Sequence, residues 1–86
     1  MTVLNLLYFA WVRERIGRGE ESIARPAPGT TIKTLLDTLS AGSEGHEAAF
    51  ADRARLRAAL DQRFVPLETE IGDARELALF PPVTGG

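Results

Sequence analysis

The two most apolar segments of this chain lie near its two ends, and their placement restricts the fold more than any other feature. In residues 2–10 both alternating faces are apolar except at Asn5, a pattern typical of a central strand that is covered on both sides. Residues 76–80 form a second short apolar run of strand length. We therefore expect the first and last strands to lie side by side at the centre of one sheet.

One amphipathic helix is predicted between these strands. Its apolar side chains recur at i, i+3, i+4 and i+7, on one face of a helix, and they are Ile32, Leu35, Leu36 and Leu39. A turn cluster rich in proline precedes it at residues 26–29. Thr30 or Thr31 is placed to cap the helix N-terminus, and Gly42 is placed to end it. We expect this helix to pack across the sheet.

The segment after the first strand predicts a hairpin. Charged residues at 13–15 break the apolar run, and Gly17 and Gly19 indicate a turn. Residues 20–25 are expected to pair back on the first strand as a second, more exposed strand. The two strands would be joined by a wide connection.

The second half of the chain predicts a loop followed by short strands. Residues 43–57 are polar, and we expect a loop with one helical segment outside the central core, in which His46 is solvated. Residues 56–60 and 64–67 are expected to form two short strands linked around the dipeptide 61–62. The last strand, described above, follows them.

The order strand, strand, helix, strand, strand, strand predicts an α+β fold of the ubiquitin-like, β-grasp kind. It would have a mixed sheet of about five strands with one main helix packed across it. A chain of 86 residues supports a single hydrophobic core. We expect one β-grasp domain over residues 1–80 and a flexible C-terminal tail over residues 81–86. This fold serves carriers, protein modifiers and interaction domains alike, so function must come from specific residues.

Composition excludes several classes of function. With no cysteine and one histidine, the chain lacks a nucleophilic thiol and the ligands of a conventional zinc site, so we expect no bound metal. A formal net charge of −2 argues against a nucleic-acid partner, because phosphate binding needs a basic surface. The longest apolar run, residues 6–12, is far shorter than the roughly 20 residues that span a membrane. No signal-peptide pattern opens the chain, and we expect a cytoplasmic protein without a membrane partner.

The C-terminal sequence Phe-Pro-Pro-Val-Thr-Gly-Gly, at residues 80–86, is the candidate functional segment. The two terminal glycines have no Cβ, so their backbone can pass through a channel too narrow for other residues. Pro81 and Pro82 stiffen the point where the tail leaves the domain. No phosphate-binding loop or catalytic triad is present in the sequence. The expected reactive group is therefore the terminal carboxylate of Gly86.

Three segments of the chain resemble the small, sulfur-carrier subunit of molybdopterin synthase. They are Leu-Tyr-Phe-Ala-Trp-Val-Arg-Glu at 7–14, Ala-Leu-Asp-Gln-Arg-Phe-Val at 59–65 and Leu-Ala-Leu-Phe-Pro-Pro-Val-Thr-Gly-Gly at 77–86. The third segment is the most specific motif of that family. The chain departs from the family at Asp61, where asparagine is usual, and at Ala74 and Arg75, where a Gly-Asp pair is common.

The resemblance implies a function for the tail. In that family a separate E1-like adenylating enzyme uses ATP to convert the terminal carboxylate, here that of Gly86, into an acyl-adenylate. Sulfur from a donor system then replaces the adenylate to give a thiocarboxylate. The loaded tail enters the large subunit of the synthase, which transfers the sulfur to cyclic pyranopterin monophosphate and so builds molybdopterin. The chain itself would bind no cofactor and hold no catalytic site, and the complex would be a heterotetramer of two small and two large subunits.

The same resemblance assigns binding roles to individual residues. The residues expected to insert with the tail are Pro81, Pro82, Val83, Thr84 and Gly85. The residues expected to contact the large subunit are Phe9, Arg13, Phe64 and Phe80. A second interpretation is open for the phenylalanines, because phenylalanine is more often a core residue; for Phe80, beside the tail, we favour the interface. Arg13 could equally be a solvated surface residue.

Three other functions are compatible with this fold and tail. A sulfur carrier for thiamin thiazole synthesis shares both, but those chains are generally shorter, and residues 43–57 together with Phe-Pro-Pro favour the molybdopterin family. A ubiquitin-like modifier would be joined through Gly86 to lysines of target proteins. In a plain interaction domain the tail would be inert.

Overall fold

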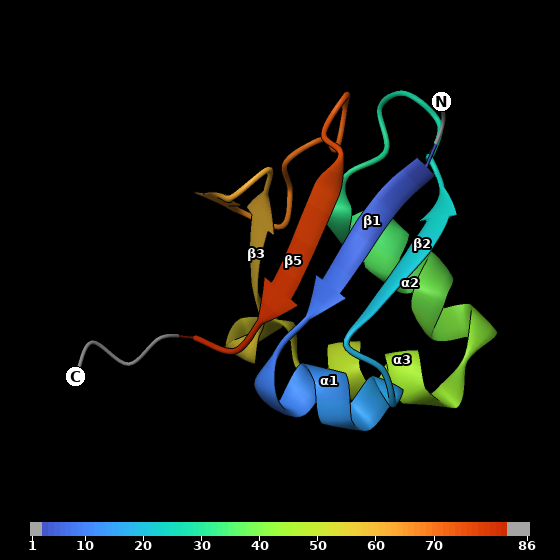
Figure 1. Ribbon diagram of the computed structural model, residues 1–86, viewed down its shortest axis with the longest axis vertical. Helices are drawn as coiled ribbons and strands as arrows, with labels where there is room; N and C mark the ends of the chain where they lie inside the picture. The colour runs from blue at the N-terminus through green and yellow to red at the C-terminus, as the bar shows by residue number, and fades with distance from the viewer. Residues whose placement is uncertain (1–2, 83–86) are drawn as a thin grey trace.

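The computed structural model describes residues 3–82 as a mixed sheet with α2 crossing behind it (Figure 1). In chain order the elements are β1 (Val3–Tyr8), α1 (Ala10–Ile16), β2 (Glu20–Ala24), α2 (Ile32–Gly42), α3 (Glu44–Phe50), the 3-10 helix η1 (Arg53–Arg55), β3 (Arg57–Leu60), β4 (Arg63–Val65) and β5 (Glu76–Phe80). The five strands are ordered β2-β1-β5-β3-β4. This topology confirms the predicted α+β, β-grasp class.

The first and last strands lie side by side within the sheet, as their apolar sequences predicted. β1 and β5 pair in parallel, with Leu7 opposite Ala78. β2 pairs antiparallel with β1, and β3 pairs antiparallel with β5. Both β1 and β5 point toward the end of the molecule where α1 lies (Figure 1). The chain therefore leaves the sheet at that end.

Helix α2 follows its predicted bounds closely. Thr31 caps it, because its Oγ1 accepts a hydrogen bond from the backbone N–H of Thr34 at 3.1 Å. The residues of the predicted apolar stripe that are buried are Ile32, Leu35 and Leu36, while Leu39 packs against the core from its edge. None of the helices within residues 3–82 is long and apolar enough to cross a membrane.

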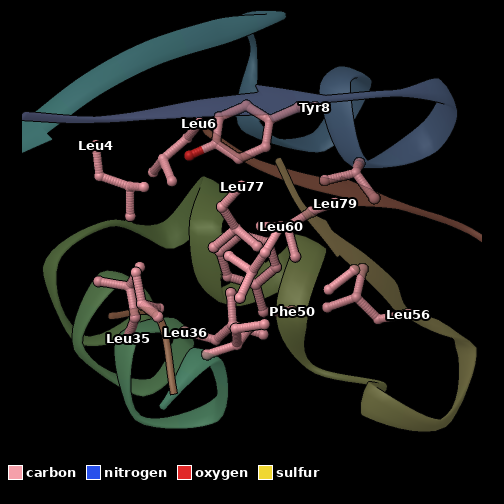
Figure 2. Close-up of a cluster of buried hydrophobic side chains, with 14 of the residues drawn as sticks. Leu4, Leu6, Tyr8, Leu35, Leu36, Phe50, Leu56, Leu60, Leu77 and Leu79 are labelled. Carbon is pink, nitrogen blue, oxygen red and sulfur yellow. The ribbon is translucent and has the colours of Figure 1, made fainter. Parts of the chain in front are cut away.

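The helices cover one face of the sheet and leave the other open. On β1 the alternate residues Leu4, Leu6 and Tyr8 are buried in the core, and Figure 2 shows them pointing into the cluster of leucines. Val3 and Asn5, which alternate with them, are exposed. The prediction that this strand is covered on both sides is therefore wrong. A two-sided apolar sequence here produces one core face and one apolar open face.

The connection between β1 and β2 contains a helix, α1, where the sequence predicted a break and a turn. Val12 is fully buried, whereas the charged side chains at 13–15 are exposed. The helix ends at Gly17, whose φ of 96° gives a left-handed cap. The charges that indicated a break are therefore the solvent side of a helix of only seven residues.

Residues 43–57 also differ from the prediction, because they contribute to the core. The segment contains α3 and η1, and Ala49 and Phe50 at the end of α3 are buried. A Cβ added at Gly45 would lie 2.9 Å from the carbonyl oxygen of Arg15. The missing side chain at this glycine is thus what lets α3 approach α1 so closely.

His46, expected in a solvated loop, lies instead in a largely buried polar cluster, with its side chain 13% exposed. Its Nε2 is 2.7 Å from Oε2 of Glu21, and the hydroxyl of Tyr8 donates to the same oxygen at 2.6 Å. The imidazole also packs against Tyr8 and Phe50. Burial alone would raise the pKa of Glu21, but the hydrogen bonds from Tyr8 and His46 outweigh it and hold this pKa below its ordinary value. Burial, with the neighbouring carboxylate, raises the pKa of Tyr8.

The β3–β4 hairpin turns at the predicted dipeptide. Asp61 and Gln62 have φ values of 49° and 71°, the left-handed conformation that a two-residue type I′ turn requires. Oδ1 of Asp61 accepts hydrogen bonds from the backbone N–H groups of Arg75 at 2.9 Å and Glu76 at 3.1 Å. One side chain thus fastens the turn to the start of β5.

Candidate functional site

An apolar surface on the open face of the sheet is the candidate functional site. Its apolar residues, here called the open-face patch, are Leu7, Phe9, Ala59, Phe64, Ala78 and Phe80. Together with Gln62 and Glu76 they line a surface hollow of about 510 Å³. Exposed apolar patches of this kind usually mark a binding surface.

Strand register assembles the patch from segments far apart in the sequence. Leu7 on β1 is opposite Ala78 on β5, Ala78 is opposite Ala59 on β3, and Ala59 is opposite Phe64 on β4. These residues form one row across the sheet on the face that the helices leave open. The two alanines have small side chains and form the bottom of the hollow, here called the alanine floor. The larger side chains at the ends of the row and beside it form the sides of the hollow.

The phenylalanines of the patch differ in exposure. Phe64 is 76% exposed and Phe9 is 50% exposed, so the interpretation of these two as core residues is wrong. Phe80 is partly buried, and its ring centroid lies 5.3 Å from that of Phe64. An aromatic pair held against a floor of alanine presents a firm apolar surface. Their contact with a partner remains a prediction.

The patch adjoins the start of the tail. Phe80 is the last residue of β5, and the partly buried Pro81 and Pro82 follow it directly. The backbone N–H of Phe9 donates to the carbonyl of Leu79 at 3.1 Å, which holds the end of β1 beside the end of β5. A partner that covers the patch would therefore also meet the residues from which the tail departs.

The remaining predicted tail residues lie outside the described part of the chain. They are Val83, Thr84, Gly85 and the reactive Gly86. Their insertion and loading remain predictions. Arg13, the fourth predicted partner contact, is exposed on α1 and does not line the hollow. Its side chain lies instead against Gly19, the residue before β2.

Sequence reasoning missed five of the eight described residues that line the hollow. The missed residues are Leu7, Ala59, Gln62, Glu76 and Ala78. The signal that could have found Glu76 and Ala78 is the alternation of β5, in which Leu77 and Leu79 point to the core while their neighbours point to the open face. The alternation shows which residues share a face of β5, but which face is open is known only once the helices are placed.

The side chains on this face are suited to binding a partner. Within residues 3–82 no group of three histidine, aspartate or glutamate side chains could hold a metal ion. The hollow presents aromatic and aliphatic surface, one amide and one carboxylate. These groups can bind and orient a partner, and none of them is arranged with a second group for proton transfer or nucleophilic attack.

Comparison with known proteins places the chain in a family. The model of the ThiS family matches residues 6–86. The molybdopterin synthase sulfur carrier subunit of Escherichia coli is 36% identical over 84 residues, covering 98% of this chain and 100% of the relative. The subunit of the same description from Mycobacterium tuberculosis is 31% identical over 86 residues, covering 100% of both chains.

Solved structures share the fold. SAMP1 from Haloferax volcanii superimposes with a TM-score of 0.74 at 25% identity, covering 98% of this chain and 99% of that chain. A chain in the complex of subunits 1 and 2 of the molybdopterin-converting factor from Helicobacter pylori gives a TM-score of 0.63 at 22% identity, covering 98% of this chain and 99% of that chain. The second likeness shows the fold alone. With a family match over nearly the whole sequence and full-length relatives above 30% identity, this chain belongs to the ThiS family.

Proposed function

We propose that this protein is the sulfur carrier subunit of a molybdopterin synthase and that the carboxylate of Gly86 carries the sulfur. The observation that carries the proposal is the open-face patch at the base of a Phe-Pro-Pro-Val-Thr-Gly-Gly segment, in a chain whose full-length relatives are sulfur carrier subunits of this synthase. A surface for docking and a carboxylate at the end of an arm are what a carrier needs.

The proposed chemistry begins with activation of the tail. A carboxylate resists nucleophilic attack until one oxygen becomes a good leaving group, and attack of this carboxylate on the α-phosphate of ATP provides that with release of pyrophosphate. Sulfur from the donor system, at the oxidation level of sulfide, then attacks the acyl carbon; the bond to AMP breaks, AMP leaves and a thiocarboxylate remains on Gly86. ATP is bound by the E1-like adenylating enzyme, and this chain binds no cofactor of its own.

The second stage is delivery to the large subunit. The open-face patch docks on that subunit and directs the tail into its active site, where sulfur passes to cyclic pyranopterin monophosphate. The large subunit supplies the catalytic groups, while this chain supplies the docking surface and the sulfur. Aromatic residues at the centre of such a surface usually carry a large part of the binding energy.

The docking step is tested by replacing Phe80 with alanine. Because Phe80 packs against Phe64 at the base of the tail, Phe80→Ala is expected to weaken binding to the large subunit by about 2 kcal/mol or more, the scale of an aromatic hot spot. Val3→Ala is the matched control, since Val3 is an exposed apolar residue of β1 that does not line the hollow. Equal affinities of the two variants in calorimetry, with both folds intact, would contradict docking through the patch.

A second candidate is a protein modifier joined through Gly86. It is favoured by the likeness to SAMP1 from Haloferax volcanii, because SAMP1 is a small archaeal modifier protein. An isopeptide-linked ladder in cell extracts, lost on deletion of Gly86, would support this function. Lys33 is the one lysine of the chain, so conjugation of the protein to itself would be limited to that residue.

A further inference from the structure

The hollow in the open-face patch contains one carboxylate, that of Glu76. This residue stands on β5 two positions before Ala78 and four before Phe80, so all three point to the same face. Glu76 is partly buried, and its side chain forms no ion pair within residues 3–82. The only side chain beside it in the hollow that carries a polar group is Gln62, which has no charge.

The position of Glu76 is fixed without help from its side chain. Its backbone N–H donates to Oδ1 of Asp61 at 3.1 Å, and its carbonyl accepts from the backbone N–H of Asp61 at 3.0 Å. These backbone hydrogen bonds fix the main chain of Glu76 at the polar end of the hollow and leave its carboxylate without a hydrogen-bond partner among the described residues. The carboxylate is available to a partner, and no fold contact among the described residues has to be broken to engage it.

A partner that covers the phenylalanines must also remove water from this carboxylate. An ionised group that loses water without gaining a counter-charge opposes binding, whereas one that gains a charged donor favours it and selects the partner. The shape of the hollow indicates the form of that donor. The floor of Ala59 and Ala78 lies between Leu7 on one side and the Phe64–Phe80 pair on the other, which fits an apolar stem, and Glu76 is the residue before Ala78 on this face of β5.

From these observations we infer that Glu76 is a specificity-determining residue of the patch and pairs with a lysine or arginine of the synthase large subunit. The apolar stem of that side chain lies on the alanine floor, and its cationic head meets the carboxylate. The inference rests on the proposed function for the identity of the partner. It adds a charge requirement that the apolar residues alone do not impose.

The test is calorimetric titration of the full chain against the large subunit from the same organism. Glu76→Gln is expected to weaken binding about 30-fold or more, and Glu76→Lys more strongly still, because the cation then meets a like charge. Glu70→Lys is the control with the same change of net charge, since Glu70 is exposed beside Thr31 at the start of α2. It is expected to stay within about twofold of the wild type. Unchanged thermal midpoints show that the variants are folded.

A charge-reversal scan of the large subunit completes the test. In combination with Glu76→Lys, one lysine-to-glutamate or arginine-to-glutamate variant of the large subunit is expected to restore affinity. If Phe80→Ala weakens binding but Glu76→Gln and Glu76→Lys behave like Glu70→Lys, the pairing of Glu76 is overturned while docking through the patch stands. If Phe80→Ala is also without effect, docking through the patch itself is overturned.

Discussion

At the β3–β4 turn, a single carboxylate connects two strands that are distant in sequence. Oδ1 of Asp61 accepts two backbone N–H groups at the start of β5, from Arg75 and Glu76. Asp61→Ala removes this acceptor and keeps a left-handed residue with a Cβ, so we expect a loss of about 1–3 kcal/mol in the free energy of unfolding. Asp61→Asn keeps an oxygen acceptor and tolerates the same φ, and should stay close to the wild type in urea unfolding. Equal stability of the alanine and asparagine variants would show that these hydrogen bonds contribute little.

The next residue of the turn predicts the opposite effect. Gln62 adopts a φ of 71°, a conformation that costs a residue with a Cβ and costs glycine nothing. Gln62→Gly is therefore expected to raise the free energy of unfolding by roughly 0.5–1 kcal/mol. Gln62→Ala retains the Cβ and serves as the control, with little change expected. A glycine variant less stable than the alanine variant in thermal unfolding would rule out backbone strain at this turn.

At the scale of elements, the polar cluster under α3 predicts a pH-dependent stability. In the folded state the pKa of Glu21 lies below its ordinary value of 4.5, so the unfolded state binds this proton more tightly. The stabilisation is therefore complete above the unfolded pKa and is lost as the pH falls through the lower folded pKa. Glu21→Gln should cost about 1.5–3 kcal/mol at pH 7, the range for hydrogen bonds to a charged acceptor. Urea unfolding at pH 7 and at pH 3 measures the difference, which should shrink at pH 3; a difference independent of pH would contradict the account.

The elements also show where sequence patterns suffice. Helix α2 was predicted because its cap and its apolar stripe are local, within residues 31–42. One helical segment was predicted within residues 43–57, but the packing of α3 into the core was not, since it is held by the contact of His46 with Glu21, which lies 25 positions earlier. Helix α1 buries Val12 and exposes its charged residues. With seven residues it is too short for a helical period of apolar positions to be recognised in the sequence. Local patterns predict an element whose stabilising contacts are local, and miss one whose contacts come from elsewhere in the chain.

The open-face patch was predicted in part for the same reason. Phe9, Phe64 and Phe80 came from a family resemblance, and the structure brings all three to one hollow. The alanine floor and Glu76 depend on the register of β5 against β1 and β3, which no single segment encodes. The predicted two-sided burial of β1 failed because the helices cover only one face of the sheet; on the other face Leu7 lines the hollow, while Val3 and Asn5 are exposed. An apolar pattern reports that a face is to be covered, and it does not distinguish a core from a partner.

In the whole molecule, one face of the sheet packs in the core and the opposite face carries the open-face patch. The core lies on the helix side of the sheet and includes Leu4 of β1 and Leu79 of β5. The open face carries the open-face patch, beside the start of the tail. Changes at the end of the tail should therefore leave folding intact. We expect deletion of Gly86 to leave the thermal midpoint unchanged within about 1 °C, the change that a few tenths of a kcal/mol would cause in a domain of this size.

The proposed function requires that the carboxylate of Gly86 becomes a thiocarboxylate, and intact mass spectrometry measures this conversion. The protein is incubated with ATP, the adenylating enzyme and a sulfur donor, alongside the Gly86 deletion and a variant extended beyond Gly86. We expect that only the wild type gains the mass difference between sulfur and oxygen, and that it does so only when ATP is present. The wild type with the added mass should then support molybdopterin formation with the large subunit. An unchanged mass of the wild type, or the same gain in the Gly86 deletion, would contradict the sulfur-carrier function.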